Sequence, residues 1–154
     1  MDADDKCTPL KSLQGKIWHE GYRTGNLRAE VYRDVPPAFY RWTEKEKTIS
    51  IFSSGSIFAQ RLMFAYTTCG DLSGFLRAFF DTTTGGKREP GSYRRISSAI
   101  GEACSSVFFI SDTIQELDAA HAAGLETGLC LRDAESTDLA SDHRVIRSFD
   151  ELLA

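Results

Sequence analysis

The sequence predicts a parallel α/β fold, because short apolar segments alternate with amphipathic segments along the chain. Residues 48–53 and 107–110 are rich in β-branched and aromatic residues, as expected of strands. The second of these runs contains no polar residue, which is typical of a strand that helices cover on both faces. In such a sheet the functional groups gather at the carboxyl ends of the strands.

Hydrophobic spacing and end signals assign the first elements. We expect a helix over residues 8–22, where apolar residues recur at helical spacing, and then a short connection over 26–33. Asp34 is expected to cap the next helix, which carries two prolines in its first turn. The strand 48–53 comes next, and Ser56 is placed to cap the helix that follows it.

The second half of the chain continues this alternation, with glycine as the helix stop. The expected elements are a short strand at 79–80, a helix over 92–100 that ends at Gly101, the strand 107–110, a helix over 113–123 that ends at Gly124, strands at 127–131 and 144–146, and a helical turn at 149–153. Strands and helices in this order predict one layered parallel sheet.

Composition and charge argue against several classes of function. The 154 residues are enough for a domain with its own core, and the net charge of −4 without a continuous basic stripe argues against nucleic acid as a partner. No apolar run reaches the roughly 18 residues of a membrane span, and the acidic start does not resemble a signal peptide, so no membrane partner is expected. The four cysteines form no CxxC pair, which favours a cytoplasmic location.

The turn Ser53-Ser54-Gly55-Ser56 follows a predicted strand and precedes a predicted helix. Its hydroxyls can donate to phosphate oxygens, and the start of a helix attracts anions. The simpler interpretation is an ordinary helix cap. A serine hydrolase is not indicated, because the segment is not GxSxG and no partner histidine stands out.

Lys87 follows a small, flexible segment, and its ammonium could neutralise a phosphate. A Walker A loop would need a glycine at Asp81, so this segment is not a P-loop. The alternative is a solvated surface lysine.

Asp112 follows the apolar strand at 107–110, and Glu116 lies four residues further on. Mg²⁺ prefers a few carboxylates together with waters and a substrate phosphate, so both acids are candidates for a metal shell. Otherwise Asp112 caps the next helix and Glu116 is a charge on its face.

Hydroxyls after one strand, then a lysine, then an acid after a later strand form a specific order. Receiver domains place their acids before the hydroxyl and their lysine last. The sequence blocks that carry a family resemblance are Leu13–Trp18, Ser53–Ser56, Ala59–Phe64, Gly70–Leu72, Phe80–Gly85 with Lys87, and Ser111-Asp112 with Glu116. On these blocks the chain resembles an enolase-phosphatase (acireductone synthase) of the haloacid dehalogenase superfamily, from about residue 9 to residue 132.

The resemblance implies a haloacid dehalogenase-like Rossmannoid parallel sheet with flanking helices. Residues 1–33 would be the remnant of a helical cap and residues 34–154 a partial core. The implied activity belongs to methionine salvage, where the family uses Mg²⁺ to enolise and dephosphorylate the phosphate ester 2,3-diketo-5-methylthiopentyl-1-phosphate, giving an acireductone.

The resemblance also implies roles for individual residues. Ser53, Ser54 and Lys87 match the contacts to the substrate phosphate. Asp112 matches a Mg²⁺ ligand, and Glu116 matches the supporting acid of the same motif.

The sequence departs from the family in one important respect. The family has a strand that ends in an Asp-x-Glu-Gly-Thr-like motif, whose first aspartate attacks phosphorus, and no segment of these 154 residues matches it. We therefore expect no catalytic nucleophile in this chain and a missing central strand. The strands before Ser53 and Asp112 should then either pair directly or leave unpaired backbone groups between them.

Three hypotheses follow from this departure. The chain is the C-terminal part of an enolase-phosphatase, inactive alone because it lacks the acceptor aspartate. Alternatively it is a non-catalytic phosphate-binding or interaction module. In the third hypothesis it is one half of a split enzyme, and a separate chain supplies the first strand.

Overall fold

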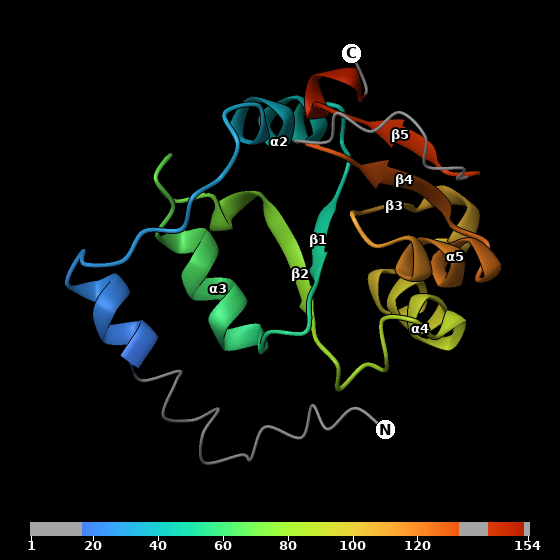
Figure 1. The fold of residues 1–154 in the computed structure, drawn as a ribbon, viewed down its shortest axis with the longest axis horizontal. Helices are drawn as coiled ribbons and strands as arrows, with labels where there is room; N and C mark the ends of the chain where they lie inside the picture. The colour runs from blue at the N-terminus through green and yellow to red at the C-terminus, as the bar shows by residue number, and fades with distance from the viewer. Residues whose placement is uncertain (1–16, 133–141, 153–154) are drawn as a thin grey trace.

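The computed structural model describes residues 17–132 and 142–152, and Figure 1 shows how their elements are arranged. Within these residues the strands form two separate parallel sheets, one of two strands and one of three. Helices pack against both sheets, which confirms the predicted α/β class.

The first sheet pairs β1 (Ile49–Phe52) with β2 (Leu76–Phe80) in parallel. Helix α2 (Val35–Glu44) precedes β1, helix α3 (Ile57–Ala65) connects β1 to β2, and the 3₁₀ turn η1 (Ser73–Phe75) leads into β2. The predicted strand at 79–80 is therefore real but begins earlier, at Leu76.

The second sheet has the order β3-β4-β5. Its elements are helix α4 (Pro90–Ile100), the turn η2 (Cys104–Ser106), β3 (Phe108–Ser111), helix α5 (Ile114–Ala122), β4 (Glu126–Cys130), β5 (Arg144–Ile146) and the turn η3 (Phe149–Glu151). The sequence predicts each of these segments except η2 to within a few residues at its ends.

Local end signals behave as the sequence predicts. Ser56 Oγ accepts from the backbone N–H of Ala59 at 3.2 Å and so caps α3. Gly101 ends α4 with φ +79°, and Gly124 follows α5 with φ +95°, a left-handed conformation that glycine adopts without strain. Of the first predicted helix, residues 17–23 are helical and residues 8–16 lie outside the described part.

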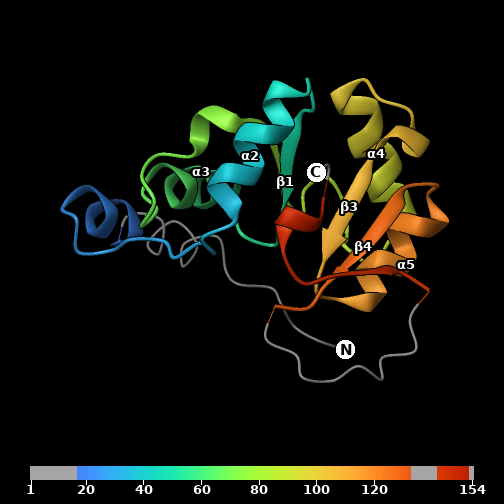
Figure 2. The same cartoon turned by 90° about the horizontal axis from the view of Figure 1, so that it is seen from above.

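The two sheets lie side by side, with β1 and β3 as the facing edges (Figures 1 and 2). The ring of Tyr93 from α4 lies between them, 5.7 Å from the ring of Phe52 in β1 and 4.9 Å from that of Phe109 in β3. Of the two expected outcomes, direct pairing is therefore wrong. Side chains connect the two edges, while within residues 17–132 and 142–152 the backbone of β1 pairs only with β2 and that of β3 only with β4.

One hydrophobic cluster covers a face of both sheets. Phe39 and Trp42 of α2 pack with Ile49 and Phe79 of the first sheet and with Ile146 of the second. Trp42 also lies 5.3 Å from the ring of Phe149, between ring centroids. This shared core explains how the two sheets hold their relative position without a ladder between them.

β3 is less covered than its composition predicts. Phe108 keeps 37% of its surface exposed, and the other three residues of the strand are only half-buried. The expectation of a strand covered on both faces is wrong here. In the described part of the chain no strand pairs with the edge of β3 that faces β1, so the side chains of β3 lack cross-strand neighbours on that side.

Residues 17–33 pack at the outer side of α3 (Figure 1). Ala29 forms a parallel bridge with Thr67, and the rings of Tyr22 and Tyr66 stack with their centroids 5.9 Å apart. The division into a cap remnant at 1–33 and a partial core at 34–154 stays a prediction. No helix in the described ranges is long and apolar enough to cross a membrane.

Candidate functional site

The turn after β1 places its two serines at the carboxyl end of the first sheet. Ser53 donates its N–H to Phe80 O at 3.1 Å, so it continues the pairing of β1 with β2. Its Oγ accepts from the N–H of Gly55 at 3.1 Å, which leaves the hydroxyl hydrogen available to a ligand. Ser54 is exposed. The turn can therefore present two hydroxyl donors to an anion.

Asp81 already occupies part of the start of α3. Its Oδ2 accepts from the N–H of Ile57 at 3.4 Å, and its Oδ1 accepts from the N–H and hydroxyl of Thr83 at 2.9 and 2.6 Å. The negative charge of Asp81 partly neutralises the positive end of the α3 dipole. An anion at this turn therefore depends on the hydroxyls and on a separate cation.

Lys87 is the candidate for that cation, and hydrogen bonds hold the backbone of Gly86 and Lys87. The hydroxyl of Tyr93 donates to Lys87 O at 2.5 Å, and Ser92 Oγ donates to Gly86 O at 2.7 Å. Tyr93 is buried, and this burial, together with the nearby charge of Glu116, raises the pKa of its hydroxyl. The tyrosine therefore remains a hydrogen-bond donor at neutral pH.

The ammonium of Lys87 forms an ion pair with Glu116. Lys87 Nζ lies 2.7 Å from Glu116 Oε2, and the two side chains are only 24% and 12% exposed. The same Oε2 accepts from the hydroxyl of Ser111 at 2.9 Å. One cation, one carboxylate and one hydroxyl thus form a network at the carboxyl end of β3.

Lys87 also lies close to the first sheet. Its Nζ is 6.0 Å from the centroid of the Phe52 ring, and Phe52 is the residue before Ser53. The lysine therefore stands where the carboxyl ends of β1 and β3 come together. The structure thus brings Lys87 and Glu116 together close to Phe52, the residue before the serine turn.

Asp112 is exposed at the end of β3, and its Oδ1 accepts from the hydroxyl of Thr113 at 3.2 Å. Thr113, not Asp112, takes the N-cap position of α5, so the alternative role of Asp112 as a helix cap is wrong.

Within residues 17–132 and 142–152, no group of three or more His, Cys, Asp or Glu side chains could hold a metal. At the end of β3 the exposed carboxylate of Asp112 could contact Mg²⁺, while Glu116 is engaged by Lys87, so further ligands would come from water or the substrate.

Comparison with known proteins gives a consistent result. The chain is 51% identical over 152 residues to enolase-phosphatase E1 of Sorangium cellulosum and 49% identical to that of Synechococcus elongatus, and both alignments cover 99% of the chain. It superposes on the crystal structure of the UTR4 protein of Saccharomyces cerevisiae with a TM-score of 0.84 and 36% identity, covering 97% of this chain and 69% of that one. The chain belongs to the enolase-phosphatase family.

The match to the enolase-phosphatase family is partial in length. The chain spans 66% and 64% of the two bacterial relatives. A haloacid dehalogenase-superfamily phosphatase of Thermococcus onnurineus, at 20% identity and a TM-score of 0.68, shows the same fold. No family model matches the chain.

Three residues of this enolase-phosphatase chain support the site but were not assigned a role from the sequence. They are Gln60, which bonds to the serine turn, Asp81, which holds the start of α3, and Tyr93, which holds the backbone of Lys87. The sequence offers one sign of this role: Gln60 is polar but lies four residues before Phe64, and therefore on the buried face of α3.

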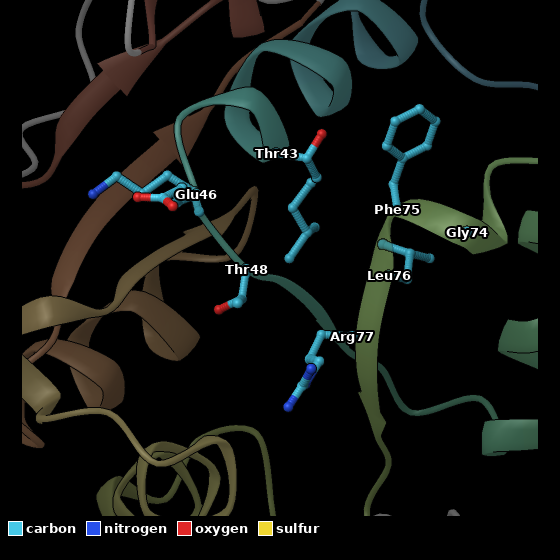
Figure 3. A pocket seen from close by; sticks show the side chains of 9 residues that line it. Thr43, Glu46, Thr48, Gly74, Phe75, Leu76 and Arg77 are labelled. Atoms are coloured by element: carbon cyan, nitrogen blue, oxygen red, sulfur yellow. The ribbon is translucent and has the colours of Figure 1, made fainter.

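A pocket of about 340 Å³ lies elsewhere in the structure (Figure 3). Its lining includes Thr48 and Ile49 at the start of β1 and Leu76 at the start of β2. It therefore opens at the amino ends of these strands, opposite to the serine turn. None of the candidate phosphate-site residues lines it.

The backbone of Gly85 permits a sharp prediction about the segment before Lys87. Gly85 has φ +140°, and a Cβ there would clash with the side chains of Arg95 and Ser92. We expect Gly85→Ala to lower the free energy of unfolding by about 1–3 kcal/mol, because a strained backbone adds to the clash. Urea unfolding of the two proteins measures this loss.

Gly74→Ala is the matched control for this measurement. A Cβ at Gly74 meets no atom within 4 Å, and its φ is compatible with other residues. We expect a change of less than about 0.5 kcal/mol at this exposed position. Equal losses in the two variants would contradict the special role of Gly85.

Proposed function

We propose that this chain forms the phosphate-binding part of an enolase-phosphatase of methionine salvage. The proposed substrate is 2,3-diketo-5-methylthiopentyl-1-phosphate, converted to an acireductone by enolisation and dephosphorylation. The observation that carries the proposal is the position of Lys87, paired with Glu116 at the end of β3 and close to Phe52 beside the serine turn. The identity to enolase-phosphatases over 99% of the chain supports the choice of substrate.

In the proposed complex the serine hydroxyls and Lys87 hold the phosphate. Ser53 and Ser54 donate hydrogen bonds to its oxygens, and the ammonium of Lys87 offsets its charge. Glu116 keeps the lysine in place, and the exposed carboxylate of Asp112 is the proposed contact to Mg²⁺. The ion would neutralise phosphate charge, with its remaining ligands coming from water, the substrate and residues outside this chain.

We further propose that phosphate release needs a parallel strand between β1 and β3. Among the described residues no strand pairs with the facing edges of β1 and β3, and both strands end at the candidate site. The strand that carries the family's Asp-x-Glu-Gly-Thr-like motif would supply both the missing ladder and the nucleophile. The 154 residues alone are then expected to bind phosphate without turnover, as in a non-catalytic phosphate-binding module.

Complementation tests this proposal. A segment that contains the Asp-x-Glu-Gly-Thr-like motif is taken from the Sorangium cellulosum relative. It is co-expressed with the chain as a separate polypeptide. We expect the two to copurify and to release phosphate from the substrate with Mg²⁺. A control segment with the first Asp changed to Asn should copurify without activity.

Two results would contradict the proposal. Hydrolysis by the purified chain alone would show that the nucleophile lies within these 154 residues. Failure of both segments to copurify would show that the edges of β1 and β3 do not accept the strand.

A further inference from the structure

Gln60 is a buried polar residue on a helix face that otherwise packs apolar side chains. It is 3% exposed, and Phe64, four residues later on the same face of α3, is also buried. Burial of a primary amide is unfavourable unless hydrogen bonds compensate for the lost water. The partners of Gln60 therefore indicate why this residue is present.

Both hydrogens of the Gln60 amide connect the serine turn to the neighbouring strand. Nε2 donates to Gly55 O at 2.8 Å, inside the turn, and to Phe80 O at 2.9 Å, at the last residue of β2. The same Phe80 O accepts from the N–H of Ser53 at 3.1 Å. One side chain thus fixes the backbone on both sides of Ser54.

The carbonyl oxygen of the Gln60 amide, unlike the two N–H groups, makes no such hydrogen bond in the described part of the chain. Gln60 Oε1 is buried without a hydrogen-bond partner within the described part of the chain. A buried unpaired acceptor lowers stability, so the side chain is favoured for its two donors and not for general packing. Neither leucine nor glutamate offers two such donors.

We infer that Gln60 is a positioning residue of the candidate phosphate site. It holds the Ser53–Ser56 turn in the conformation that presents the hydroxyls of Ser53 and Ser54 to an anion. Preorganisation of this kind raises affinity, because the turn is already ordered before the ligand binds. The inference rests on the proposed function and adds a residue to it that does not touch the ligand.

The test uses the full chain, the variant Gln60→Leu and inorganic phosphate as the probe. We expect Gln60→Leu to weaken phosphate binding by about tenfold and to speed hydrogen exchange of the backbone amides of residues 53–57 without phosphate. The matched control is Leu62→Ala, which removes a buried side chain of the same helix that makes no contact through an amide. It should lower the melting temperature but leave phosphate affinity and exchange in the turn unchanged.

The outcomes separate the inference from the proposed function. Unchanged affinity and exchange in Gln60→Leu would overturn the inference, as would equal losses in both variants, since these indicate only reduced stability. Absence of phosphate binding by the unmodified chain would overturn the proposed function and, with it, the role of Gln60 at that site. The exchange data would then still decide whether Gln60 fixes the turn.

Discussion

Replacing Lys87 with alanine is expected to weaken the binding of inorganic phosphate by roughly tenfold to a hundredfold. A charge-assisted hydrogen bond contributes about 1.5–3 kcal/mol, and about 1.4 kcal/mol corresponds to a factor of ten in affinity. Lys87 is the cation that the structure places beside Phe52 and Glu116, where the two sheets end. Isothermal titration of the two proteins with phosphate measures the change.

The same substitution leaves Glu116 as a largely buried carboxylate without its cation. Lys87→Ala should therefore lower stability as well, and a loss of binding alone would be ambiguous. The double variant Lys87→Ala with Glu116→Gln removes the unpaired charge and keeps an acceptor for Ser111. We expect it to regain stability relative to Lys87→Ala while phosphate affinity stays low.

Glu116→Gln alone separates the two roles further. The glutamine keeps an acceptor oxygen that can hold Lys87 in place, but it removes the charge that competes with phosphate for the ammonium. Phosphate affinity should therefore rise relative to the unmodified chain. Unchanged affinity in all three variants would show that Lys87 has no role in anion binding.

The features that the sequence predicts well depend on local chemistry. Ser56 caps α3 because a serine hydroxyl reaches the N–H three residues later, whatever the rest of the chain does. Gly101 and Gly124 end helices because their backbone adopts positive φ without strain. Parallel strands bring their carboxyl ends to one edge of a sheet, and Lys87 accordingly lies close both to Phe52 of β1 and to Glu116 after β3.

The features that sequence reasoning misses depend on partners far along the chain. The spacing of Asp112 and Glu116 indicates a shared metal shell, but the structure pairs Glu116 with Lys87, 29 residues earlier in the numbering. The role of Gln60 likewise depends on Phe80, a residue of another element. No local pattern fixes which of several nearby charges or carbonyl groups such a side chain selects.

Asp34 is a further residue whose role the sequence only partly predicts. It takes the N-cap position of α2, as expected, but its side chain makes no capping hydrogen bond. Its Oδ2 instead accepts from Arg132 Nη1 at 2.5 Å, from the N–H of Phe149 at 2.6 Å and from Ser148 Oγ at 3.0 Å. The guanidinium carbon of Arg132 also lies 4.5 Å from the centroids of the Tyr32 and Phe149 rings.

These contacts change how Asp34 responds to pH. Burial alone would raise its pKa, but the hydrogen bonds from Arg132, Phe149 and Ser148 outweigh it, and the pKa lies below its ordinary value. The carboxylate therefore stabilises the fold fully above the unfolded-state pKa near 4, and this contribution is lost as pH falls through the lower folded-state pKa.

Asp34→Ala is expected to lower the free energy of unfolding at pH 7 by about 3–5 kcal/mol. The substitution leaves the guanidinium of Arg132, whose side chain is 12% exposed, without its carboxylate and detaches the turn η3 from the start of α2. Domains are typically stable by only about 5–15 kcal/mol, so the variant should be close to unfolding. Urea unfolding at pH 7 and pH 3 measures both effects, and the difference between the two proteins should shrink at the lower pH.

Asp150→Ala is the matched control, because it removes an exposed carboxylate from η3. Asp150 pairs with Arg41 at 3.1 Å, but its side chain is 62% exposed, so we expect a loss of about 0–1 kcal/mol. If both variants lost equal stability, or if the Asp34→Ala difference did not shrink with falling pH, the carboxylate of Asp34 would not be what joins η3 to α2. The expected contrast instead ties the relative position of the two sheets to one carboxylate, because η3 and α2 pack into the core that both sheets share.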